Sequence, residues 1–169
     1  LREHKGSLAN LKLAYIGDGN NVCHSLMLAA ARGGTKMAVG TPAGYEPKPE
    51  MVQAAREDGK DTGFALTLTN SAEEAVSGAD AVYTDVWASM GQEAEKEKRA
   101  RIFAPYQVNA RLMSHAKNGA IFMHCLPAHR GDEVTDEVID APSSVVYDQA
   151  ENRLHAQKAI LLALMGKKD

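Results

Sequence analysis

Short apolar runs alternate along this chain with longer segments of helical periodicity, and this alternation constrains the fold more than any other feature. The expected strands cover residues 11–17, 36–42, 64–70, 78–87, 120–125 and 143–148. The expected helices cover residues 20–34, 49–59, 91–103, 109–116 and 149–166, and one more begins after Ser71. Strands that are apolar on both faces and alternate with helices are typical of a parallel sheet covered on both sides. The sequence therefore predicts a single α/β domain, a Rossmann-like parallel sheet with helices on both faces.

Several helix ends carry local signals. Gly33 and Gly34 are expected to stop the first long helix, and Pro49 suits the opening turn of the second. Ser71 followed by Glu74 has the spacing of a capping box, in which each side chain bonds the other residue's backbone N–H.

Charge and cysteine count exclude several classes of function. The 169 residues carry a net charge of −3 and no basic block longer than "KEKRAR", so neither nucleic acid nor an anionic membrane is expected as the main partner. The two cysteines are far apart, which gives no disulfide framework and fits a reducing compartment. No apolar run approaches the roughly 20 residues of a membrane span, and no signal peptide is visible. We therefore expect a cytoplasmic protein.

Unusual residues gather where three of the expected strands end. The segments are "GDGNN", "DVWASMGQE" and "HCLPAHRGDE". Ligands of open parallel sheets bind at the carboxyl ends of the strands, so these segments are expected to form the site.

The segment "GDGNNV" resembles the start of a dinucleotide fingerprint, but its third glycine is missing. The next strand also ends in "VGTP", without the acidic residue that would bind a ribose. A nicotinamide cofactor is therefore disfavoured, and no cofactor is expected. Asn20 and Asn21 open a helix, where amide groups and free backbone N–H groups hold a small anion; the alternative is that asparagine simply caps the helix.

Asp85 stands at the end of a buried strand and could pair with an ammonium group of a ligand. The alternative is that its carboxylate bonds the backbone of its own loop. Met90, five residues on, would ordinarily be read as core packing.

The segment "HCLPAHR" allows three readings. A zinc site is disfavoured, because His124 and Cys125 are adjacent and point to opposite faces of a strand. A reactive thiolate at Cys125 needs a positive neighbour, which Arg130 could supply. Leu126 and Pro127 favour a rigid turn, with a cis bond as one option, that would turn backbone carbonyls toward the crevice.

Arg153 lies in the first turns of the expected last helix. A solvated surface arginine is the commonest reading of such a residue. Anion binding is the alternative.

In this order and spacing, "GDGNNV", "DVWASMGQE", "HCLPAHRGDEV" and "AENRLHAQKA" resemble the second half of ornithine carbamoyltransferase. The likeness covers essentially the whole chain, residues 1–169, as an ornithine-binding domain. The chain begins at "LREHKG" rather than at methionine, and we expect an excised domain of a longer protein. The first domain of the family carries a "STRT" phosphate loop and a "HPxQ" segment, and neither string occurs here.

The resemblance implies the partners and the reaction. The family transfers the carbamoyl group of carbamoyl phosphate to the δ-amine of L-ornithine, a step of arginine metabolism, and works as a homotrimer or a multiple of it. Its first domain forms the trimer, and the last helix packs against that domain. The fragment alone is accordingly expected to be inactive and to bind ornithine weakly.

Roles for individual residues follow from the same resemblance. The amino and carboxylate groups of ornithine would be held by Asn21, Asp85, Ser89 and the backbone of Met90.

Cys125, as the catalytic residue, and the Leu126 carbonyl would face the δ-nitrogen and the carbamoyl group across a cis Leu-Pro bond. Arg153 would help to bind carbamoyl phosphate, and no metal is expected. The rival interpretations are a transcarbamylase for another amine, such as putrescine or an acetylated ornithine, a non-catalytic amino-acid-binding module, and a nicotinamide dehydrogenase.

Overall fold

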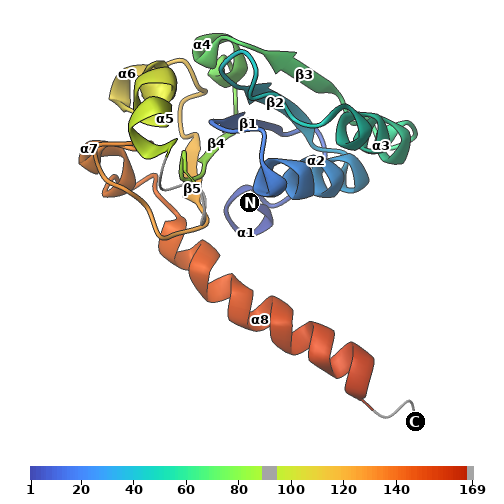
Figure 1. Cartoon of the computed structure of the whole chain (residues 1–169). Helices are drawn as coiled ribbons and strands as arrows, with labels where there is room; N and C mark the ends of the chain where they lie inside the picture. The colour runs from blue at the N-terminus through green and yellow to red at the C-terminus, as the bar shows by residue number, and fades with distance from the viewer. Residues whose placement is uncertain (89–94, 167–169) are drawn as a thin grey trace.

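The computed structural model describes residues 1–88 and 95–166, and it contains a five-stranded parallel sheet in the order β3-β2-β1-β4-β5 (Figure 1). The strands are β1 (Lys12–Ile16), β2 (Lys36–Gly40), β3 (Leu66–Thr69), β4 (Ala81–Thr84) and β5 (Ile121–His124). Every neighbouring pair is parallel. The α/β class, the parallel sheet and five of the six expected strands are confirmed.

Helices lie on both faces of the sheet. They are α1 (Arg2–Lys5), α2 (Asn21–Gly33), α3 (Pro49–Gly59), α4 (Ala72–Val76), α5 (Lys96–Phe103), the 3-10 turn Ala104–Tyr106, α6 (Ala110–Met113), α7 (Asp136–Ile139) and α8 (Val146–Met165). One apolar cluster joins the sheet to α2 and α3, and a second joins it to α4, α6 and α7. Alternate residues of β1 enter opposite clusters, Tyr15 the first and Ile16 the second, as the period of a strand requires.

The sixth expected strand, residues 143–148, is wrong. Only Ser144 forms a bridge to β5, through Phe122, and α8 begins at Val146. The strand-like pattern has a real cause, because Val145 is buried in one cluster and Val146 in the other. Two valines that pack on opposite sides satisfy the apolar pattern of a strand, but here they only lead the chain from the sheet edge into a helix.

The local signals at the helix ends are confirmed in part. Pro49 opens α3, and the Ser71 hydroxyl accepts a hydrogen bond from the Glu74 backbone N–H at 3.1 Å. The reverse half of the capping box is missing, because the Glu74 carboxylate instead accepts from the Thr69 hydroxyl. Gly34 ends α2 in the left-handed conformation, with φ of 67°.

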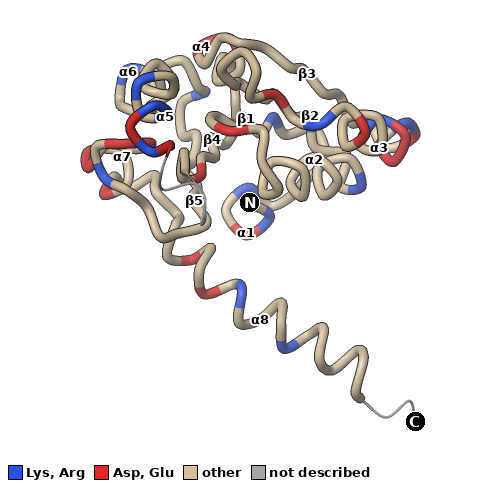
Figure 2. Tube along the Cα trace, in the orientation of Figure 1, with Lys and Arg blue, Asp and Glu red and all other residues tan. Residues whose placement is uncertain are grey.

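Helix α8 extends away from the sheet beyond its first turns (Figure 1). From Ala159 to Met165 it carries no charged residue (Figure 2), and its large apolar side chains there are exposed. None of the helices within the described residues is long and apolar enough to cross a membrane.

We expect Gly34→Ala to destabilise the fold by about 2 kcal/mol or more. A left-handed backbone costs an L-residue about 1–2 kcal/mol, and a Cβ at Gly34 would also lie 2.5 Å from the Thr62 backbone oxygen. Gly63→Ala is the matched control, because Gly63 has φ of 83° but open space around its Cβ position. Urea unfolding measures both losses, and equal losses would show that the contact with Thr62 is unimportant.

Candidate functional site

The loops that follow β1, β4 and β5 meet at the carboxyl edge of the sheet and enclose a cavity of about 640 Å³. Its wall includes Asn21, Asp85, Trp87, Arg99, Leu126 and Pro127. This is the edge at which ligands of open parallel sheets bind. Described residues of all three segments singled out in the sequence therefore line one cavity.

Asp85 is the acceptor at the centre of this site. Its side chain is only 6% exposed, and its Oδ1 accepts hydrogen bonds from the Val86 backbone N–H at 2.8 Å and from the Cys125 thiol at 3.0 Å. Its Oδ2 accepts from the Asn20 side-chain amide at 3.0 Å. The carboxylate thus bonds its own loop, as the structural alternative proposed, and also faces the cavity.

The two asparagines after β1 have different positions. Asn20 caps α2, since its Oδ1 accepts from the backbone N–H groups of Val22 at 2.9 Å and Cys23 at 3.1 Å. The Tyr15 hydroxyl donates to the same oxygen at 3.2 Å. Asn21 is exposed and lines the cavity. Asn20 is therefore the helix cap, and Asn21 lines the cavity.

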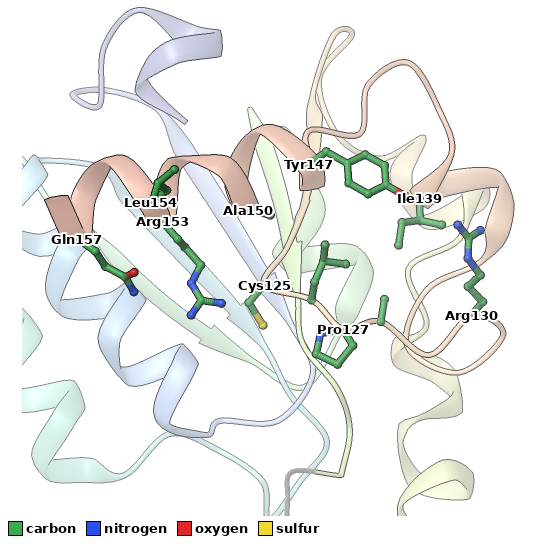
Figure 3. A pocket seen from close by; sticks show the side chains of 11 residues that line it. Cys125, Pro127, Arg130, Ile139, Tyr147, Ala150, Arg153, Leu154 and Gln157 are labelled. Atoms are coloured by element: carbon green, nitrogen blue, oxygen red, sulfur yellow. The ribbon is translucent and has the colours of Figure 1, made fainter.

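Cys125 is a protonated thiol in this arrangement. Burial, followed by the hydrogen bond to Asp85 and the charge of that carboxylate, raises the pKa of its thiol to about 12. Arg130 does not supply a positive neighbour, because its guanidinium donates to Asp136 and Asp140, each at 2.6 Å, and points away from the thiol (Figure 3). Of the readings left open for this segment, a thiolate stabilised by Arg130 is therefore not supported.

His124 explains why the chain turns directly after Cys125. Its Nδ1 accepts the Leu126 backbone N–H at 2.8 Å, so the ring proton lies on Nε2, which is 3.1 Å from Glu133 Oε1. Both side chains are fully buried. The Glu133 carboxylate also accepts the His129 backbone N–H at 2.6 Å, which closes the loop. His124 and Cys125 do lie on opposite faces of the sheet, and no group of three or more metal-ligand side chains is found in the described parts of the chain.

The Leu126-Pro127 bond is cis, and Leu126 has φ of 56°. The rigid turn expected from the sequence is confirmed, and it lies between two hollows of the surface. Leu126 and Pro127 line the cavity of Asp85 on one side and, on the other, a groove beside α8.

Arg153 lines this groove together with Cys125, Leu126 and Tyr147 (Figure 3). Because α8 begins at Val146, Arg153 lies one turn further into the helix than the sequence suggested. The structure places Arg153 and Cys125 on the same groove. Ser89 and Met90 fall in 89–94, outside the described residues.

Arg99 is a site residue that sequence reasoning missed. It is 6% exposed, and its Nη1 donates to Asp18 Oδ2 at 2.6 Å and to the Trp87 carbonyl at 2.7 Å. Its guanidinium also lies 5.0 Å from the centre of the Tyr45 ring. It thereby joins the loops after β1, β2 and β4. The available signal was its spacing of four residues from Phe103, which places both on the buried side of α5.

We expect Arg99→Met to destabilise the protein by about 3–5 kcal/mol, because it leaves the Asp18 carboxylate largely buried without its partner. Arg101→Met, at an exposed position of the same helix, should change stability by less than about 0.5 kcal/mol. Thermal and urea unfolding of the two variants measure the difference. Similar stability of both would mean that the Asp18 pair does not hold the loops.

We expect alkylation of Cys125 by iodoacetamide to be slow near neutral pH and to rise about tenfold per pH unit up to about pH 10, because only the thiolate reacts. A cysteine in a short peptide should level off near pH 9 in the same assay, close to its ordinary pKa. Asp85→Asn removes one cause of the raised pKa and should react faster than the parent chain at the same pH. A plateau for Cys125 below about pH 9 would contradict the assigned protonation state.

Comparison with known proteins agrees with the geometry. Residues 9–164 match the family described as aspartate/ornithine carbamoyltransferase, Asp/Orn binding domain. The chain is 60% identical over 166 residues to ornithine carbamoyltransferase of Carboxydothermus hydrogenoformans, covering 98% of this chain and 53% of that protein. It is 57% identical to ornithine carbamoyltransferase of Thermococcus kodakarensis, covering 97% of this chain and 52% of that protein.

Solved structures give the same result. Ornithine carbamoyltransferase from Pyrococcus furiosus superposes with a TM-score of 0.95 at 55% identity, over 99% of this chain and 54% of that one. The enzyme from Gloeobacter violaceus gives a TM-score of 0.90 at 50% identity, over 98% of this chain and 55% of that one. The chain thus spans about half the length of these relatives. It belongs to the aspartate/ornithine carbamoyltransferase family and matches the Asp/Orn-binding domain of that family.

Proposed function

We propose that residues 1–169 are the ornithine-binding half of an ornithine carbamoyltransferase. The parent enzyme would transfer the carbamoyl group of carbamoyl phosphate to the δ-amine of L-ornithine and release L-citrulline and phosphate. The observation that carries this proposal is the Asp85 carboxylate, held by three donors at a cavity that is bounded by the Leu126-Pro127 turn.

The cavity suits the headgroup of an amino acid. A carboxylate has about four lone-pair sites, so three donors leave Asp85 with one site for an ammonium group. Asn21 lines the same cavity, and we propose that its amide donates to the carboxylate of the ligand. Ser89 and the backbone of Met90 are proposed to complete this contact, because they directly follow the described wall residues Trp87 and Ala88.

The δ-amine must lose a proton before it attacks the carbamoyl carbon. Burial, the largest cause of the raised pKa of the Cys125 thiol, also disfavours an ammonium group beside it. The neutral thiol also adds no second negative charge next to Asp85. We propose that Cys125 and the Leu126 carbonyl contact the δ-nitrogen, and that in the resting state the thiol keeps its proton and donates a hydrogen bond to Asp85.

Release of phosphate needs cationic stabilisation. Arg153 is the arginine proposed for this role, because it shares a groove with Cys125 and Arg130 is already paired. The remaining cations are proposed to come from a carbamoyl-phosphate domain, as the resemblance implies. Assembly of the parent as a homotrimer or a multiple of it, a role in arginine biosynthesis and a cytoplasmic location are proposed on the same basis.

The rival amines are less suited to this cavity. Putrescine has no carboxylate for Asn21, and an ornithine acetylated on its α-nitrogen has no α-ammonium group for Asp85. The remaining rival is a non-catalytic module that binds an amino acid. It differs from our proposal only in whether the full-length protein is active, and an assay of citrulline formation by that protein distinguishes the two.

We expect L-ornithine to bind this chain with a dissociation constant of about 1 mM or weaker, because a half-site leaves much of the ligand in water. Titration of the isotope-labelled chain by NMR should shift the amide signals of Asn21, Val86 and Leu126. Putrescine is the matched ligand control, and Asp85→Asn is the matched variant. Micromolar affinity, or equal shifts with putrescine, would contradict the proposed half-site.

The purified chain should form no citrulline from ornithine and carbamoyl phosphate above a blank without protein. The physical reason is that most of the cationic groups needed for phosphate departure are not among its residues. Colorimetric detection of citrulline measures this directly. Turnover above the blank would show that the single domain is sufficient.

A further inference from the structure

The wall of the Asp85 cavity carries charges of both signs. Its carboxylates are Asp85, Asp132 and Glu133, which lie on the loops after β4 and β5. Its lysine and arginine side chains are Lys96 and Arg99, which both belong to α5. A ligand in this cavity therefore meets negative charge from the loops and positive charge from the helix.

Helix α5 presents one face to the cavity. Lys96, Arg99 and Ala100 all line it, at the spacing of three and four residues that places side chains on the same side of a helix. The exposed Lys98 is two residues from Lys96 and lies on a different side. The position of Lys96 on the wall thus follows from the orientation of the whole helix.

The two cations on this face have different partners. Arg99 is bound within the protein, because its guanidinium donates to Asp18 at 2.6 Å and to the Trp87 carbonyl at 2.7 Å. These bonds hold α5 against the loops after β1 and β4. Within residues 1–88 and 95–166, the exposed Lys96 side chain forms neither an ion pair nor a hydrogen bond. Lys96 is therefore the cation of the described wall that can pair with a ligand.

A ligand carboxylate would enter this cavity against three carboxylates of the wall. Asn21 offers it an amide dipole but no charge that would offset the repulsion. A positive charge at the same cavity would offset it, because charges that line a cleft act on a bound ion more strongly than isolated surface charges. Lysine suits this position, since its flexible stem and three donors reach a carboxylate without a fixed geometry.

We propose that Lys96 is a specificity-determining residue of this cavity. Its ammonium group pairs with the carboxylate of the bound amino acid, and it thereby distinguishes a zwitterionic headgroup from a plain amine. The identity of the ligand rests on the proposed function, whereas the distribution of charge on the wall does not.

The test compares L-ornithine with L-ornithinamide, which keeps both amines and has a neutral amide in place of the carboxylate. Lys96→Glu should raise the dissociation constant of L-ornithine about three- to tenfold, because an attraction becomes a repulsion. The same variant should bind L-ornithinamide as tightly as the parent chain does, or more tightly, because this ligand carries only positive charge. NMR titration, followed at the amide signals of Val86 and Leu126, measures both constants.

Lys98→Glu is the matched control, because it makes the same change of charge on another side of α5. It should change the dissociation constant of L-ornithine by less than about twofold. Lys96→Met removes the charge without reversing it and should give an intermediate value. Added salt should reduce the difference between Lys96→Glu and the parent chain, since it screens exposed charges. Thermal unfolding verifies that each variant is folded at the assay temperature.

Equal binding of L-ornithine by Lys96→Glu and the parent chain would overturn the proposal, and so would an equal loss of affinity for L-ornithinamide or in Lys98→Glu. L-Norvaline, which has the same headgroup and no δ-amine, separates this result from a failure of the proposed function. If Lys96→Glu weakens the binding of L-norvaline while L-ornithine does not shift the amide signals around Asp85, the role of Lys96 stands and the proposed function fails. If neither amino acid shifts these signals, both proposals fail.

Discussion

A buried carboxylate is stable only if donors surround it, and this requirement at Asp85 organises the whole carboxyl edge of the sheet. Its donors come from three separate loops: Asn20 after β1, the Val86 backbone after β4 and Cys125 after β5. Each strand end is thereby held at a fixed distance from the others.

A charge pair holds the loop after β1 against the loop after β4. Asp18 lies two residues beyond the end of β1, and its side chain is only 13% exposed. Arg99 takes up that charge and also bonds the Trp87 carbonyl, so the loop that leads toward Ser89 starts from a fixed point. Asp132 and Glu133 also line the cavity, but Asp85 is the carboxylate that joins the loops after β1, β4 and β5.

The sequence was informative wherever local chemistry decides the structure. Strand periodicity, Pro49, Ser71 and the break at Leu126-Pro127 all act within a few residues, and their outcomes agree with the structure. The sequence was uninformative wherever a side chain bonds a residue that is far away along the chain. Whether Asn20 or Asn21 lines the cavity depends on Tyr15 and Asp85, and the role of Arg99 depends on a residue 81 positions away. The same reason explains the false strand at 143–148, because two buried valines look alike whether the chain continues as a strand or turns into a helix.

The apolar end of α8 has a consequence for the dynamics of the chain. Leu162, Leu164 and Met165 are 70% exposed or more, so no tertiary contact within the described residues stabilises the last two turns. A helix held only by its own backbone opens and closes rapidly, whereas its first turns are anchored through Val146 and Gln149. The rate at which amide hydrogens exchange with solvent should therefore increase along α8 toward Met165. Slowed exchange at that end would report directly on the docking of any surface that covers it.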